Sequence, residues 1–169
     1  KVAACTISHM RLWQHCIDIN EPILILEHDA IFIRSFNYRT IAETGHRNRQ
    51  EQGEWSGGIC AINDPTGATR KAHIYHQKVL SEIEKSDSSS GIVSVPYVDD
   101  PGDLPLPTGL PGNSAYIIKP WDAKKLLDKT LEIGLWPNDA LMCRQFFPWL
   151  QIYAPYFTSV QHTRSTTTT

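Results

Sequence analysis

The chain has 169 residues, a formal net charge of −2, and 41% hydrophobic against 20% charged side chains. This length corresponds to one domain with a sizeable core, and the composition is that of an ordinary globular protein. The near-neutral charge excludes the basic footprint typical of nucleic-acid-binding proteins. No apolar run approaches the roughly 20 residues of a transmembrane segment. We expect one domain over residues 1–162 and a flexible polar tail over 163–169.

The sequence opens without a signal-peptide pattern, so we expect a cytoplasmic protein, with peripheral association with a membrane left open. Its cysteines, Cys5, Cys16, Cys60 and Cys143, lack the C-x-x-C spacing of zinc knuckles and thioredoxin-like sites. We favour buried free thiols over a disulfide.

Short helical and strand patterns alternate along the chain, which predicts an α/β domain. Helices are predicted at Thr6–Ile19, at His73–Lys85, from Asp122 to Leu131 and at Ala140–Phe147. Strands are predicted at Ile23–Leu26, Ile59–Ile62, Ile92–Val95, Ala115–Ile118 and Ile152–Ala154. A polar excursion over residues 34–55, a turn over 63–67 and a long loop over 99–112 separate them. The expected amino-terminal caps are Thr6 or Ser8, Asp122, and Asn138 or Asp139.

The most informative segment is Ile23–Leu26, which runs directly into Glu27-His28-Asp29. A short, uninterrupted, branched apolar run predicts a buried central strand. Two carboxylates at its end are costly to bury unless they are paired or hold a cation. Ligands of open α/β sheets collect at the carboxyl ends of strands. We therefore predict that Glu27 and Asp29 hold a divalent metal against a phosphate-bearing substrate, the alternative being a solvated cap on the following turn.

Two histidines near this strand have a functional and a structural interpretation of similar weight. Strand alternation directs His28 away from its two acidic neighbours, so packing is as well supported as ligation. His9, on the first predicted helix, is either a polar contact near the metal strand or a satisfied core histidine.

Three blocks of sequence occur in a fixed order. Ala4–Trp13 reads A-C-T-I-S-H-M-R-L-W, Ile25–Phe32 reads I-L-E-H-D-A-I-F, and Gly112–Ile118 reads G-N-S-A-Y-I-I, with A-K-K-L-L at Ala123–Leu127. They are similar to the G-C-x-x-S-H-x-x-x-W, I-L-E-D-D and G-x-x-A-Y-L-I/A-x-x-L-L blocks of glycosyltransferase family 25, the lipopolysaccharide and collagen-type sugar transferases. In this chain His28 replaces the middle acid of E-D-D.

The resemblance implies a fold of the GT-A type, an α/β domain with a mixed central sheet flanked by helices. The family's first strand, which helps to hold the nucleotide, is expected to be missing ahead of Lys1. The implied reaction transfers a sugar from a nucleotide-sugar, foremost a UDP-sugar, to a glycan acceptor of the cell-surface or lipopolysaccharide type. The implied cofactor is Mn²⁺ or Mg²⁺, and a histidine ligand would favour Mn²⁺.

The resemblance also implies roles for individual residues. Asp139, after Trp136-Pro137, would be the catalytic base. The metal ligands would be Glu27, Asp29 and His162. Contacts with donor and acceptor would come from His9, His28, Asn113, Ser114 and Trp136, the last either stacking on a sugar ring or packing in the core.

Two other functions compete with sugar transfer. The His28 replacement and the missing first strand fit a non-catalytic carbohydrate- or nucleotide-binding relic of the same fold. A metal-dependent phosphoryl-transfer or hydrolytic enzyme would share the acids at the strand end but not the other two blocks.

Overall fold

The computed structural model describes residues 2–38, 58–68, 72–86, 91–97 and 109–161. Within these ranges the helices are α1 (Val2–Ile19), α4 (Ala72–Lys85), α5 (Pro120–Ile133) and the short α6 (Asn138–Leu141). The strands are β1 (Ile23–Leu26), β2 (Ala30–Phe32), β3 (Ile59–Ala61), β4 (Ile92–Ser94), β5 (Ala115–Ile118), β6 (Gln151–Tyr153) and β7 (Thr158–Val160). The predicted excursion over 34–55, the loop over 99–112 and the tail over 163–169 lie wholly or mostly outside the described residues.

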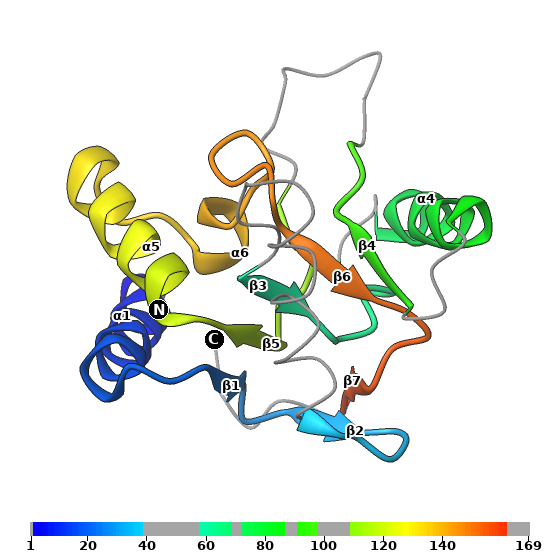
Figure 1. Cartoon of the computed structure of the whole chain (residues 1–169), viewed down its shortest axis with the longest axis horizontal. Helices are drawn as coiled ribbons and strands as arrows, with labels where there is room; N and C mark the ends of the chain where they lie inside the picture. The colour runs from blue at the N-terminus through cyan, green and yellow to red at the C-terminus, as the bar shows by residue number, and fades with distance from the viewer. Residues whose placement is uncertain (1, 39–57, 69–71, 87–90, 98–108, 162–169) are drawn as a thin grey trace.

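The main sheet has five strands in the order β1-β5-β3-β6-β4 (Figure 1). Only the β3–β6 pair is parallel, and the other neighbours are antiparallel. A separate two-stranded sheet joins β2 to β7. The expected α/β domain with a mixed central sheet flanked by helices is therefore confirmed.

Both faces of strand β5 are buried, which places it at the heart of the domain. Because side chains alternate across a strand, Tyr116 and Ile118 join the larger apolar cluster, which includes Trp13 and Leu126. Ala115 and Ile117 join a smaller cluster on the opposite face, together with Phe157 and other apolar side chains.

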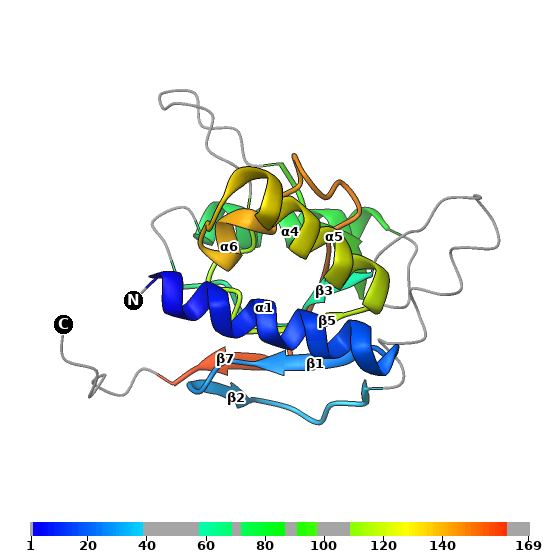
Figure 2. The same cartoon turned by 90° about the vertical axis from the view of Figure 1, so that its left-hand side faces the viewer.

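Helices α1 and α5 pack side by side, α1 along the β1 edge of the sheet (Figures 1 and 2). Trp13 and Cys16 are fully buried on the inner face of α1, while Leu12 and Ile19 are partly exposed on the outer face. In the described part of the chain, no helix combines the length and apolarity that a bilayer span requires.

All five predicted strands form, but the predicted placement of Ile23–Leu26 is wrong. β1 is an edge strand that pairs only with β5, in antiparallel orientation. Of its four side chains only Ile25 is buried, and Leu26 is 42% exposed. The truly buried apolar runs are β5 and β3, whose every side chain is buried.

The predicted helix caps are wrong, because each helix begins earlier than its polar residues suggested. Thr6 and Ser8 lie inside α1, where the Ser8 hydroxyl donates to the Ala4 carbonyl at 3.0 Å. α5 begins at Pro120 after Lys119, since proline is preorganised for the first helical position. Pro137 precedes α6, which ends at Leu141 instead of continuing to Phe147.

Candidate functional site

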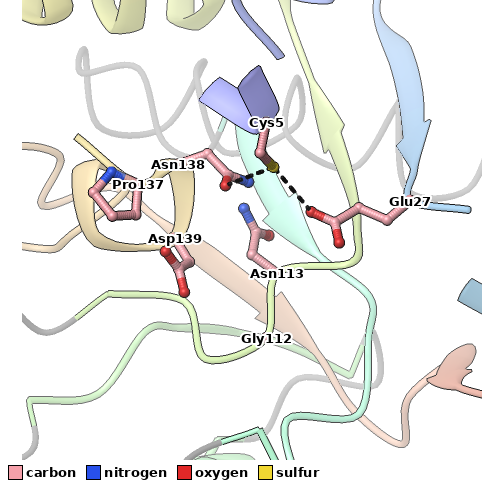
Figure 3. A pocket seen from close by; sticks show the side chains of 7 residues that line it. All are labelled: Cys5, Glu27, Gly112, Asn113, Pro137, Asn138 and Asp139. Atoms are coloured by element: carbon pink, nitrogen blue, oxygen red, sulfur yellow. Dashed lines mark hydrogen bonds between the residues drawn. The ribbon is translucent and has the colours of Figure 1, made fainter. Parts of the chain in front are cut away.

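Residues from four separate segments line a cavity of about 330 Å³ (Figure 3). The segments are the first turns of α1, the turn after β1, the loop before β5 and the start of α6. The lining residues are Cys5, Glu27, Gly112, Asn113, Pro137, Asn138 and Asp139.

The pairing of β1 with β5 brings the acidic turn to this cavity. The Glu27 N–H donates to the Ser114 carbonyl at 2.7 Å, which extends the ladder one step beyond Leu26 and Ala115. Gly112 turns the preceding loop with φ +66°, a conformation that side chains disfavour. Glu27 and Asn113 consequently line the same cavity.

His9 is buried at 4% exposure and contacts the Glu27 carboxylate. Its Nε2 lies 3.3 Å from Glu27 Oε1, and its Nδ1 lies 2.7 Å from the Tyr116 hydroxyl. The indole N–H of Trp13 donates to the same hydroxyl at 2.9 Å. Because an indole is only a donor, the Tyr116 oxygen must accept there and its own proton is available for His9 Nδ1. When Tyr116 donates to Nδ1, Nε2 carries an N–H directed at Glu27. In the other tautomer Nδ1–H donates to the Tyr116 oxygen, and the lone pair of Nε2 faces Glu27.

Cys5 lies one helical turn before His9 and points into the cavity (Figure 3). Its Sγ is 4.0 Å from Glu27 Oε1 and 3.8 Å from Asn138 Oδ1. Burial first, and then the negative charges of Glu27 and Asp139, raise the pKa of the Cys5 thiol above its ordinary value. Cys5 is therefore a neutral thiol at neutral pH.

Asp139 lines the cavity from the first turn of α6. Its Oδ1 accepts the N–H of Ala140 at 2.9 Å, which fixes the rotamer of a half-buried carboxylate. Its backbone carbonyl accepts the N–H of Leu110 at 3.1 Å. This bond ties α6 to the loop that carries Asn113.

Asn113 and Ser114 are both buried at 1% exposure. Asn113 Nδ2 donates to Met142 Sδ at 3.5 Å, but Asn113 Oδ1 and Ser114 Oγ have no hydrogen-bond partner among the described residues. Buried polar atoms without partners are rare in folded proteins and call for an explanation, such as a ligand or an ion.

Of the other residues predicted for the site, Asp29, His28 and Trp136 do not line the cavity. Asp29 is half-buried, and its carbonyl accepts the N–H of Gln161 at 2.9 Å. Its Oδ1 is buried and has no hydrogen-bond partner in the ranges that the structure describes. His28 is exposed. The Trp136 carbonyl accepts the Thr6 hydroxyl at 2.8 Å, and its ring packs edge-on to Phe146. His162 lies outside the described residues.

Sequence reasoning overlooked three residues of this site. Cys5 was expected only as a buried free thiol, whereas it is a free thiol that is exposed. Asn138 was expected only as a helix cap, and Tyr116 only as part of a buried strand. The i, i+4 spacing of Cys5 and His9 on one helix face was the signal that could have drawn attention to Cys5. No local pattern marks the hydroxyl of Tyr116 as a partner of His9, because the two residues are 107 positions apart.

One of the comparisons with known proteins, the one with protein-family models, agrees with the three sequence blocks. The model of the family described as "Glycosyltransferase family 25 (LPS biosynthesis protein)" matches residues 2–142. No curated protein and no solved structure matches the chain. The matched range contains every residue that lines the cavity, from Cys5 to Asp139. The chain belongs to glycosyltransferase family 25 and is a glycosyltransferase.

Proposed function

We propose that this cavity binds a nucleotide-sugar, foremost a UDP-sugar, and transfers its sugar to a hydroxyl of a cell-surface or lipopolysaccharide-type glycan with the help of a divalent metal. Membership of the family supports sugar transfer and its lipopolysaccharide context. The donor and the metal are parts of the proposal that the chemistry of the cavity supports. The GT-A arrangement of the sheet is a part that rests on the family resemblance alone.

The charge of the cavity is the observation that carries the proposal. Its lining residues include two carboxylates, Glu27 and Asp139, and two carboxamides, Asn113 and Asn138, but no lysine or arginine among the described residues. A diphosphate would be repelled by such a wall. A divalent cation reverses this repulsion, and oxygen-rich walls suit Mg²⁺ and Mn²⁺.

The residues present fit such a cation. Glu27 supplies a carboxylate at the cavity wall. Asp29, two residues further along the chain, does not line the cavity, but its buried Oδ1 has no hydrogen-bond partner among the described residues and is available to an ion. We assign the metal to these two side chains, with His162 as the third ligand that the family resemblance suggests. When bound, the metal neutralises the charge that develops on the leaving diphosphate.

We assign the remaining side chains to the acceptor and to the sugar. The Ala140 N–H holds Asp139 Oδ1, so Oδ2 is the oxygen that takes the proton of the acceptor hydroxyl. General-base assistance of this kind contributes about 10²- to 10⁴-fold to a rate. The unpartnered Asn113 Oδ1 accepts a hydrogen bond from a sugar hydroxyl, and Ser114 Oγ can do the same. Trp136 offers its partly exposed ring as a stacking surface.

The first experiment is calorimetric titration of the full chain with UDP, with and without Mn²⁺. We expect binding only with Mn²⁺, and loss of this binding in Glu27→Gln and Asp29→Asn. Asp128→Asn is the matched control, since this carboxylate is exposed on α5 and pairs with Lys124. A folded chain that binds UDP equally well without metal, or not at all, would refute the donor assignment.

Turnover tests the second half of the proposal. With a UDP-sugar bound, the wild-type chain should release UDP when a glycan acceptor is added, and Asp139→Asn should release it about 10²- to 10⁴-fold more slowly. Metal-dependent UDP binding without turnover of any UDP-sugar would overturn the transfer step while leaving the donor site intact.

A further inference from the structure

Three potential metal ligands of different chemistry meet at one corner of the cavity. Cys5 Sγ, His9 Nε2 and an oxygen of Glu27 all lie within 4.8 Å of one another. Two of the pairwise separations are 3.3 Å for Nε2–Oε1 and 4.0 Å for Sγ–Oε1. Thiolate and imidazole are not the ligands that Mg²⁺ selects, so this group differs in kind from an all-oxygen site.

We propose that Cys5, His9 and Glu27 form a binding site for a thiophilic divalent cation of the zinc class, distinct from the oxygen-ligated metal proposed for the donor. Zinc bonds of about 2.0 to 2.3 Å in a tetrahedron place ligand atoms about 3.3 to 3.8 Å apart. The Nε2–Oε1 separation of 3.3 Å lies in this range, and the Sγ–Oε1 separation of 4.0 Å lies just above it.

The surroundings of His9 are those of a metal-binding histidine. A ligating imidazole almost always donates its second N–H to a fixed partner. Here His9 Nδ1 lies 2.7 Å from the Tyr116 hydroxyl, whose oxygen has two lone pairs and can accept from both His9 and Trp13. With the proton on Nδ1, the lone pair of Nε2 faces Cys5 and Glu27. Stacking of the His9 and Tyr116 rings, 5.8 Å apart and 11° from parallel, holds this orientation.

The cavity supplies both a route to the site and its fourth position. Cys5 and Glu27 line the cavity while His9 is buried behind them. A tetrahedral ion held by these three side chains therefore keeps one position open to a water molecule from the cavity. Binding breaks the S–H bond of Cys5, whose proton passes to solvent, and forms a thiolate–metal bond.

Such an ion would act on the donor site, and this consequence rests on the proposed function. Glu27 belongs to both groups of ligands, so an ion held by Cys5 and His9 withdraws Glu27 from the donor metal. Zinc should then weaken the Mn²⁺-dependent binding of UDP.

The test uses Co²⁺ in place of zinc, because a thiolate bound to Co²⁺ gives a near-ultraviolet charge-transfer band that oxygen ligands do not give. We expect this band in the full chain without nucleotide, and its loss when Zn²⁺ is added in competition. The band should be absent in Cys5→Ser, whose substitution lies at the cavity wall and avoids the core. Calorimetry in buffers of different ionisation enthalpy should show about one proton released per ion.

Two controls separate this site from the donor site. His15→Gln alters an exposed histidine on the same helix and should keep the band. Asp29→Asn should also keep it while losing Mn²⁺-dependent UDP binding, so failure of one proposal is distinguishable from failure of the other. Absence of the band in the wild-type chain, or its persistence in Cys5→Ser, would overturn the zinc-class site.

Discussion

Asp122 is the carboxylate whose environment most clearly opposes its charge. It lies in the first turn of α5 at 1% exposure, and the Trp149 indole N–H donates to its Oδ1. Its Oδ2 has no partner in the described part of the chain. Gly58 makes this burial possible, since a Cβ there would lie 1.3 Å from Oδ2. Burial raises the pKa of Asp122 from 3.8 to about 6, against the smaller opposing effect of the Trp149 hydrogen bond.

This shift predicts a specific pH dependence of stability. The folded protein holds the Asp122 proton more tightly than the unfolded chain, so stability contributed by this group is fully present below pH 3.8 and is lost as pH rises to about 6. The loss is about 3 kcal/mol at most. Asp122→Asn should therefore gain free energy of unfolding relative to wild type between pH 4 and pH 7, as measured by urea titration at both values.

The comparison between the two proteins removes the contribution of all other titrating groups. Asp128→Asn, an exposed carboxylate on the same helix, should show no such relative change. A difference between wild type and Asp122→Asn that stays constant from pH 4 to pH 7 would contradict the raised pKa.

At the scale of elements, two glycines with positive φ allow the cost of backbone strain to be compared at a position next to the site and at a position away from it. Gly112 (φ +66°) immediately precedes Asn113, and a Cβ on it would lie 2.8 Å from Ala68 Cβ. Gly134 (φ +87°) ends α5, and a Cβ there would meet nothing within 4 Å.

Replacing either glycine by alanine should lower the free energy of unfolding by about 1–3 kcal/mol, since both backbones disfavour a side chain. Only Gly112→Ala should also weaken Mn²⁺-dependent UDP binding, because Gly112 positions Asn113 in the cavity. Each 1.4 kcal/mol of binding free energy lost lowers the UDP affinity about tenfold. Calorimetry on both variants decides the matter. Equal UDP affinity in the two variants would show that the Gly112 turn does not position the cavity.

The elements themselves were predictable where local pattern decides them. The β5 run Ala115–Ile118 and the β1 run Ile23–Leu26 were found with their observed bounds, because four apolar residues between polar ones suffice to mark a strand. Their positions in the sheet could not be predicted, because the two runs look alike in sequence. Only the tertiary packing, which covers both faces of β5, distinguishes the central strand from the edge strand. The strands β2 and β7 were missed because neither contains a buried apolar run. Ile31 and Phe32 of β2 are exposed, and β7 contains the polar residues Thr158 and Ser159.

The site shows the same division. Glu27 was nominated from its position at the end of a strand, and Asn113 and Asp139 from the family resemblance. The fold brings all three residues to one cavity. Residue types alone could not have joined positions so far apart along the chain. The contact of His9 with Glu27 depends on how α1 crosses the edge of the sheet, which no local pattern encodes.

At the scale of the whole molecule, stability depends on the apolar layer between the helices and the sheet. Trp13 and Cys16 of α1 and Leu126 of α5 belong to one buried cluster with Tyr116 of β5. A domain has a net stability of about 5–15 kcal/mol, so shortening one buried side chain of this layer removes a large part of that stability. The same layer supports His9 from behind through the Trp13–Tyr116 hydrogen bond.

Two leucines of α5 provide a matched measure of this layer. Leu126 is fully buried in the cluster, whereas Leu131, five residues later on the same helix, is 80% exposed. Leu126→Ala should lower the free energy of unfolding by about 2–5 kcal/mol, through lost burial and the cavity left behind. Leu131→Ala should stay within about 0.5 kcal/mol of wild type. In thermal unfolding each kcal/mol corresponds to about 2–4 °C for a chain of this size. A Leu126→Ala protein as stable as Leu131→Ala would show that α5 does not pack on the sheet in solution as it does in this structure.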